Sequence, residues 1–223
     1  MSNSPATSSG SAGVTPPQHV ATGVRETPSP PLTNAPALAV NPAALGLAAF
    51  ALTTFVLSFG NAGIIAGGAV PVVFGLALFY GGVTQILAGL WEFAQKNTFG
   101  ATAFCSYGAF WMSFWYLETA TDLGKAGSGL SVATGTWLLA WAIFTLYMTF
   151  AAWRTNMATF LVFVALTLTF FALSLGDYSS SEWLTRLGGW LGIITALLAW
   201  YTSFAVVINS TFRRVVLPVG PSA

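Results

Sequence analysis

A polar segment rich in Pro, Ser and Thr changes into nearly unbroken apolar sequence at residues 41–47, which read NPAALGL. Asn41 is suited to cap a helix because its side-chain oxygen accepts from a free backbone N–H, and Pro42 suits the first turn because its missing N–H has no intrahelical partner. Helix N-termini attract anions through their free N–H groups and their dipole. We therefore expect Asn41, Pro42 and Leu45 to begin a membrane helix that meets an anionic solute.

The stretch from Glu92 to Trp111 is the densest in polar and aromatic side chains. Asn97 or Thr98 can cap the helix that follows, which then opens on the same face as the first one. Two positive helix ends on one face attract a carboxylate without a buried arginine. Glu92 stands near this entrance, where it can carry a proton or pair with Lys96, and the sequence leaves both roles open.

Deeper in the apolar sequence the polar side chains are uncharged, and Glu92 is the exception. Charged-substrate sites and proton relays usually appear as intramembrane ionisable groups. Hydroxyl and amide groups suit a small, weakly polar solute or a dehydrating anion, although most Ser and Thr bond to their own helix. The polar side chains are Thr53, Thr54, Gln85, Thr102, Ser106, Tyr107, Ser113, Thr145, Thr167, Thr169, Thr195 and Tyr201.

Composition assigns the chain to the integral membrane proteins. It has 223 residues, of which 55% are hydrophobic and 6% charged, whereas about a quarter are charged in soluble domains. A net charge of +1 offers no basic surface for nucleic acid. The single cysteine, Cys105, and the single histidine, His19, provide neither a disulfide nor a metal cluster, so we expect no metal and no cofactor. Catalytic constellations are also missing, which argues against an enzyme.

Six stretches approach the roughly 20 apolar residues that a membrane helix needs. An all-α bundle of six transmembrane helices is therefore expected over residues 41–210, between a disordered tail at 1–40 and a C-terminal tail at 211–223. Turn-like separators, among them 60–63, 95–98, 122–128, 154–156 and 177–186, are short enough for antiparallel neighbours. The expected spans are 43–59, 69–93, 101–117, 133–152, 157–175 and 189–208.

The distribution of basic residues predicts that both termini are cytoplasmic. One side collects Arg25, Lys96, Arg154, Arg213 and Arg214, and the other side has Lys125 and Arg186. Cytoplasmic loops carry the excess of Lys and Arg. The opposite loops hold the acidic residues Glu118, Asp122, Asp177 and Glu182, which agrees with this orientation. Small residues inside the spans permit close helix packing and make a homo-oligomer plausible.

These residues resemble a known family. The segment at 41–47 is similar to the NPAPLGL signature of the acetate uptake transporters, the succinate/acetate permease group also called the GPR/FUN/YaaH family, with Ala44 in place of its second Pro. The resemblance covers about residues 41–220. Its other matching positions are Phe79-Tyr80-Gly81-Gly82, Gln85, Ala88-Gly89, Glu92, Asn97-Thr98-Phe99-Gly100, Thr102-Ala103-Phe104, Ser106-Tyr107-Gly108, Phe110-Trp111 and the C-terminal Phe212 to Gly220.

The resemblance implies a six-helix protomer in a homohexamer, with one narrow solute path per protomer. Phe50, Tyr107 and Leu166 match the positions of an apolar constriction halfway along that path, and Ala199 matches a position linked to substrate size. Asn41, Pro42, Leu45, Gln85, Asn97, Thr102 and Tyr107 are the further residues expected to bind substrate, and Glu92 is the candidate proton site.

We therefore expect a multi-pass cell-membrane protein that transports acetate and other short carboxylates, among them succinate. The sequence leaves open whether transport is coupled to protons. An alternative is a channel for water or small neutral solutes, because Asn41-Pro42-Ala43 spells the aquaporin triplet. Aquaporins carry two copies on half-helices that meet in mid-membrane, whereas this sequence has one copy at an outer edge. A third class is a scaffold or sensor that transports nothing.

Overall fold

The structure, a computed structural model, describes residues 40–221, so the tail expected at 1–40 lies outside the described residues apart from Val40. The described chain is helical, without strands. Its elements are α1 (Ala43–Asn61), the 3₁₀ segment η1 (Gly67–Val72), α2 (Val73–Gly75), the π-helical segment η2 (Leu76–Thr84), α3 (Gln85–Ala94), α4 (Thr98–Ala120), η3 (Leu123–Gly129), α5 (Leu130–Ala152), α6 (Met157–Ser179) and α7 (Glu182–Phe212).

Five helical runs among the described residues are long and apolar enough to cross a membrane. Hydrocarbon offers no partner for backbone N–H and C=O groups, so a crossing segment must satisfy them within itself, and a helix does so. Each run overlaps a span expected from the sequence. The runs are Ala43–Asn61, Gly67–Ala94, Leu130–Ala152, Met157–Ser179 and Glu182–Phe212.

The expected third span corresponds to α4, which is 23 residues long. It does not reach the same apolar content, because Thr, Ser, Tyr and Glu118 interrupt its apolar residues. Much of α4 is nevertheless buried among the other helices, including Tyr107, Phe110 and Trp111. The observed fold therefore has five apolar spans and one long, more polar helix packed among them.

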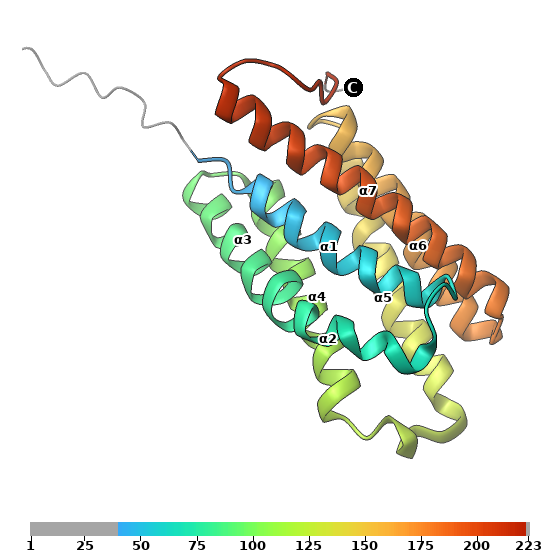
Figure 1. Ribbon diagram of the computed structural model, residues 1–223. Coiled ribbons are helices and arrows are strands. Elements are labelled where there is room, and N and C mark those ends of the chain that lie inside the picture. Colours follow the sequence, from blue (N-terminus) through green and yellow to red (C-terminus); the bar gives the residue numbers. More distant parts are fainter. Residues whose placement is uncertain (1–39, 222–223) are drawn as a thin grey trace, which may run out of the picture. The chain divides into compact units, whose positions relative to one another are not determined.

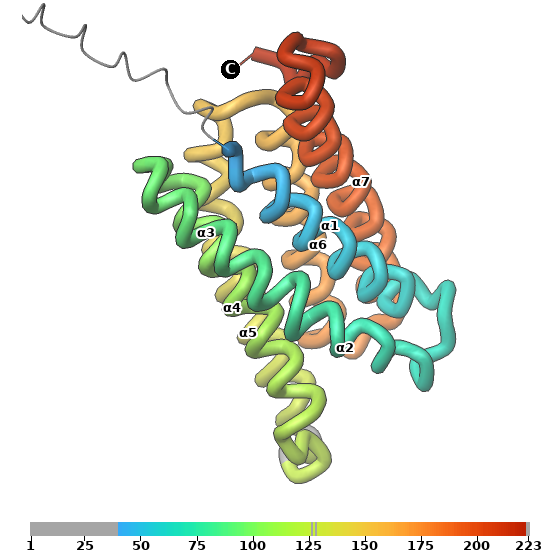
Figure 2. The backbone as a smooth tube through the Cα atoms, turned by 60° about the vertical axis from the view of Figure 1, so that its left-hand side comes forward, coloured from blue at the N-terminus to red at the C-terminus, as the bar shows by residue number. Residues whose placement is uncertain are grey.

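Antiparallel helices bring the two ends of the described chain to the same end of the bundle (Figure 1). There, the Ser203 hydroxyl on α7 donates to the Ala44 carbonyl on α1, at 2.6 Å. The views in Figures 1 and 2 both show α1 with α7 on one side and the run from η2 to α3 on the other, and contacts join it to both. Helix α5 packs mainly on α6. Its link to α4 is made by large rings, as in the stacked pair Phe110 and Trp137, whose centroids are 4.9 Å apart.

The turn between α6 and α7 is shorter than the sequence indicates. Polar residues at 177–186 suggest a loop of ten positions, but only Ser180 and Ser181 lie between the two helices. Ser180 ends α6 in a left-handed conformation, with φ 50°. Glu182 then begins α7 and accepts a hydrogen bond from Arg186 one turn later, at 2.5 Å. Opposite charges spaced four apart add modest support to a helix, which is consistent with the helical state of this polar stretch.

The residues after α7 fold back along the bundle. The Asn209 side chain accepts from the backbone N–H of Val216 and donates to the carbonyl of Leu217. Further along, the Val219 carbonyl accepts from the N–H of Ala158 at the start of α6, at 2.9 Å. The C-terminal segment is thereby held at the end of the bundle where α1, α4 and α6 begin.

Close contact between α1 and α7 depends on glycine. A Cβ at Gly189 would overlap the backbone of Ala62, whereas a Cβ at Gly75 would have no heavy atom within 4 Å. We expect Gly189→Ala to destabilise the fold by about 1–3 kcal/mol, because overpacking moves backbone. Thermal unfolding of the purified protein in detergent measures the effect.

The matched control is Gly75→Ala, which should leave stability unchanged or raise it slightly, since alanine is the better helix former. Equal transition temperatures for the two variants would show that α1 and α7 tolerate a wider separation.

Candidate functional site

Three helices begin at the same end of the bundle, and an asparagine bonds to the first turn of each. The Oδ1 of Asn41 accepts from the N–H of Ala43 at 2.9 Å. The Oδ1 of Asn97 accepts from Gly100 at 3.1 Å, and that of Asn156 accepts from Thr159 at 2.9 Å. The sequence predicts the first two and reads Asn156 only as part of a turn. An asparagine directly before an apolar run is a signal that could have identified it.

The starts of α1 and α4 lie next to each other. Gln95, in the turn before α4, donates through Nε2 to the backbone carbonyl of Val40, just before α1, at 2.5 Å. Asn41 is exposed and Pro42 is buried. The Asn41-Pro42-Ala43 triplet thus lies at an end of the bundle and not at its middle, unlike the paired triplets of a water channel.

Glu92 is held against the start of α4. It is 2% exposed, and its Oε2 accepts from the Nδ2 of Asn97 at 2.8 Å. The approach requires Gly100, because a Cβ there would lie 2.7 Å from the carboxyl carbon of Glu92. The other oxygen, Oε1, has no hydrogen-bond partner in the described part of the chain. Lys96 is exposed and forms no ion pair with Glu92 there.

Two of the three expected constriction residues are in ring contact. The ring centroids of Phe50 on α1 and Tyr107 on α4 are 5.7 Å apart, and Leu166 on α6 is buried in the same apolar core. The Tyr107 hydroxyl is hydrogen-bonded to Thr145 Oγ1 at 3.0 Å. All three expected constriction residues lie about two to three turns beyond the start of their helix. We call Phe50, Tyr107 and Leu166 the neck.

A collar of three aromatic side chains contacts Tyr107 of the neck, and sequence reasoning did not anticipate it. The Tyr107 ring lies 5.5 Å from Phe144, 6.1 Å from Phe163 and 6.2 Å from Trp141, between centroids. These residues come from α5 and α6, and nothing in their spacing distinguishes them from lipid-facing aromatics. Their contact with one tyrosine is a consequence of helix packing.

The remaining expected site residues are scattered. Gln85 on α3 is 1% exposed, and its Oε1 has no partner among the described residues. Ala199 on α7 is fully buried in the same core as the neck, and Thr102 on α4 is half-buried. Leu45 is 45% exposed and faces out of the protomer. The structure therefore groups the neck with Ala199 and leaves Leu45 on the outer surface.

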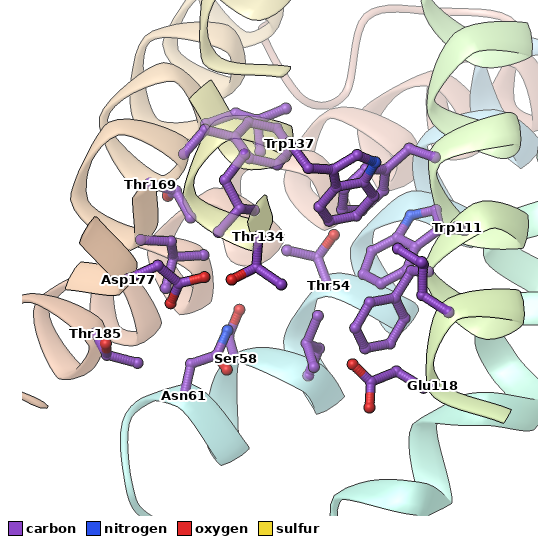
Figure 3. A pocket seen from close by; sticks show the side chains of 18 of the residues that line it. Thr54, Ser58, Asn61, Trp111, Glu118, Thr134, Trp137, Thr169, Asp177 and Thr185 are labelled. Carbon is purple, nitrogen blue, oxygen red and sulfur yellow. The ribbon is translucent and has the colours of Figure 1, made fainter. Parts of the chain in front are cut away.

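A cavity of about 210 Å³ opens beyond the neck, toward the end opposite the asparagine caps. Phe50 and Leu166 line its inner part, and α1, α4, η3, α5, α6 and α7 all contribute walls. Figure 3 shows its polar side chains, with Glu118 and Asp177 pointing into the same space from opposite sides of this view. The polar lining residues are Thr54, Ser58, Asn61, Glu118, Thr134, Thr169, Asp177 and Thr185, besides two tryptophans.

The geometry has no feature of a metal centre, since no group of three potential ligands occurs in the described residues. It is instead that of a multi-pass membrane protein with a solute-sized cavity closed by bulky side chains. Residues 25–221 match the model of the GPR1/FUN34/yaaH family. The chain belongs to this family.

Named relatives agree with this membership. Accumulation of dyads protein 2 of Saccharomyces cerevisiae is 49% identical over 75% of this chain and 61% of its own length. The succinate-acetate/proton symporter SatP of Escherichia coli K12 is 37% identical over 82% of this chain and 96% of its own. The chain spans about 60% of the length of the yeast relatives it matches.

A solved structure has the same fold. The chain superposes on the structure described as the bacterial acetate channel SatP with a TM-score of 0.76 and 37% identity, over 81% of this chain and 98% of that one. The all-helical bundle described above is therefore the fold of that channel.

Asn97 has two tasks at once, since it caps α4 and bonds to Glu92. Asn156→Ala should cost about 1 kcal/mol, the usual loss of a cap. We expect Asn97→Ala to cost about 1–3 kcal/mol more, because it also leaves a buried carboxyl group without its donor. Thermal unfolding of both variants measures the difference.

Replacing Glu92 with leucine in the Asn97→Ala background should recover most of that additional cost. Equal losses for Asn97→Ala and Asn156→Ala would mean that Glu92 is not dependent on Asn97.

Proposed function

We propose that this protein transports acetate and other short carboxylates, with succinate as a second substrate, through a narrow path inside each protomer. The observation that carries the proposal is the cavity that ends at Phe50 and Leu166, with the Tyr107 ring in contact with that of Phe50. The names of the E. coli symporter, of acetate permease A from Emericella nidulans and of the SatP acetate channel support the choice of solute.

In the proposed path, a carboxylate gathers at the starts of α1 and α4 and then passes the neck. Asn41 and Asn97 orient helix ends whose dipoles favour an anion. Gln85 and Thr102 supply polar groups along the way, and Ala199 sets the size that passes. Moving a bare carboxylate out of water costs much free energy, and hydrated ions are too large for an aromatic neck. The neck thus selects small, weakly hydrated solutes.

We propose α4 as a sixth membrane crossing. Its 23 residues span about 34 Å at about 1.5 Å per residue, which is enough for a hydrocarbon core of about 30 Å. In the middle of α4, Tyr107 is buried and Thr102, Ser106 and Ser113 are half-buried, so these polar side chains are partly shielded from lipid. Six crossings would place both termini on one side, and the excess of basic residues there supports a cytoplasmic assignment.

A homohexamer in the cell membrane is the proposed assembly. Its support is the number of large apolar side chains on outer faces of the single protomer, which only lipid or other protomers can cover. They include Phe79, Leu87 and Leu90 on the second run, and Ile143, Tyr147 and Phe150 on α5.

The neck predicts size selectivity. Leu166→Ala should widen it, so that the rate of succinate uptake relative to acetate rises roughly threefold in liposomes that contain the purified protein. Tyr107→Ala should act in the same direction. Tyr107→Phe is the matched control, because it keeps the ring and removes only the hydrogen bond to Thr145.

Wild-type rates and selectivity in both alanine variants would exclude the neck as the selective step. Osmotic swelling in acetate against glycerol tests the function itself, because permeation of glycerol and not acetate would indicate a channel for neutral solutes.

Glu92 predicts a link between acetate uptake and protons. If its carboxyl group passes a proton with each acetate, influx should acidify liposomes, and Glu92→Gln should abolish the response of uptake to an imposed proton gradient. Internal pH, followed with a trapped dye, gives the measurement. Protein-free liposomes provide the baseline, since acetic acid also crosses lipid unaided.

If an imposed proton gradient raises the acetate uptake rate equally in wild type and in Glu92→Gln, Glu92 does not carry the proton. Acetate influx without acidification of the liposome interior would show that the protein conducts the acetate anion as a channel.

A further inference from the structure

The cavity beyond the neck has an acidic opening. Glu118 near the end of α4 is exposed, and Asp177 near the end of α6 is half-buried, and both line the cavity. An acetate ion that occupies this space meets two like charges, and the low dielectric of the protein strengthens their repulsion.

No cation in the described chain lines the cavity to offset these carboxyl groups. The lining residues of α1, η3, α5 and α7 are not ionisable. The two cations at this end of the bundle are engaged elsewhere, since Lys125 pairs with Asp122 at 3.0 Å and Arg186 pairs with Glu182 at 2.5 Å. The cavity is therefore a poor place for an anion.

Two polar side chains in the cavity wall, Thr54 and Trp111, lack a hydrogen-bond partner in the described chain. The Thr54 hydroxyl is fully buried, with the residue 6% exposed, and it forms no hydrogen bond in the described chain. The three other threonines in the lining are satisfied, because Thr134 donates to the Leu130 carbonyl, Thr169 to the Ala165 carbonyl and Thr185 to the Ser181 carbonyl. Figure 3 shows Thr54 between the two acidic side chains, with Trp111 and Trp137 beside it. Buried polar groups normally have partners, so an unpaired hydroxyl inside a cavity is available to bond to a solute bound there.

The apolar part of the lining limits the chemistry of that ligand. Phe50, Phe110, Phe114 and Leu166 supply apolar walls, and the volume of about 210 Å³ is several times the roughly 30 Å³ that one water occupies. A small molecule with an alkyl portion and one uncharged group that both donates and accepts hydrogen bonds fits these walls, the unpaired hydroxyl and the acidic opening.

We propose that this cavity is a binding site for the undissociated form of a short carboxylic acid, in which Thr54 bonds to the acid group while Glu118 and Asp177 exclude the anion. The proposal rests on the proposed function and adds to it the protonation state of the substrate and the residues that select it. An undissociated acid satisfies the Thr54 hydroxyl as donor or acceptor and brings no charge past the acidic opening.

Binding of acetate to the purified protein tests the proposal, with tryptophan fluorescence as the readout because Trp111 and Trp137 line the cavity. A site for the neutral acid should show an apparent Kd that rises about tenfold for each pH unit above the pKa of the acid. Replacing Glu118 with Gln and Asp177 with Asn together should reduce that rise to less than about threefold per unit. Thr54→Val should weaken binding at low pH several-fold and keep the wild-type slope.

Glu182→Gln is the matched control, since it removes one negative charge at the same end of the bundle outside the cavity, and it should keep the wild-type slope. Thermal unfolding identifies variants that fail to fold, and Thr54→Ser, which retains the hydroxyl, should bind like wild type.

An apparent Kd that is equal at low and neutral pH, or a wild-type slope in the double variant, would overturn the proposal. So would a fluorescence response to ammonium that the double variant loses, because the carboxyl groups would then form a cation site. Uptake of acetate by liposomes distinguishes failure of this proposal from failure of the proposed function. Uptake without binding in this cavity would exclude only the binding site, whereas the absence of any uptake would exclude the proposed function.

Discussion

A chain that crosses hydrocarbon has to satisfy its own polar groups, and this requirement organises the whole protein. Helices satisfy the backbone within each span, and the N–H groups left over at the helix starts bond to Asn41, Asn97 and Asn156. Since those helices run in the same direction, their positive ends collect at one end of the bundle. The backbone alone therefore makes this end of the bundle electrostatically positive relative to the other end, independently of charged side chains.

The same requirement makes the exceptions informative. Four fully buried polar groups lack partners among the described residues: Thr54, Gln85, Glu92 and Trp111. Three of them, Thr54, Gln85 and Glu92, lie on helices that border the neck, the cavity or the cap of α4, and Trp111 is in the cavity wall. In a membrane interior, where water is scarce, unpaired groups of this kind are expected where a passing solute supplies the missing hydrogen bond.

Sequence reasoning could predict what depends on local chemistry. Long apolar runs define the spans, and an asparagine before such a run defines the start of α1 and of α4. It overestimated the loop at 177–186, because polar residues continue α6 to Ser179 and begin α7 at Glu182, where an ion pair four residues apart supports the first turn. It could not predict the collar around Tyr107 or the joint position of Glu118 and Asp177. Those groupings arise from helices that are distant in sequence. The polar residues around Asp177 also predict a loop there, whereas α6 continues past Asp177 to Ser179.

The turn between α3 and α4 is only three residues long, 95–97, and Asn97 ties it to Glu92. Helix α4 is also the least apolar of the long helices, so on its own it would partition poorly into lipid. The short turn changes that balance, because the apolar run Gly67–Ala94, which ends in α3, can carry α4 into the bilayer as one hairpin. The short turn thus has a consequence for biosynthesis: the two helices are expected to leave the insertion machinery together, with α4 shielded before the rest of the bundle is complete.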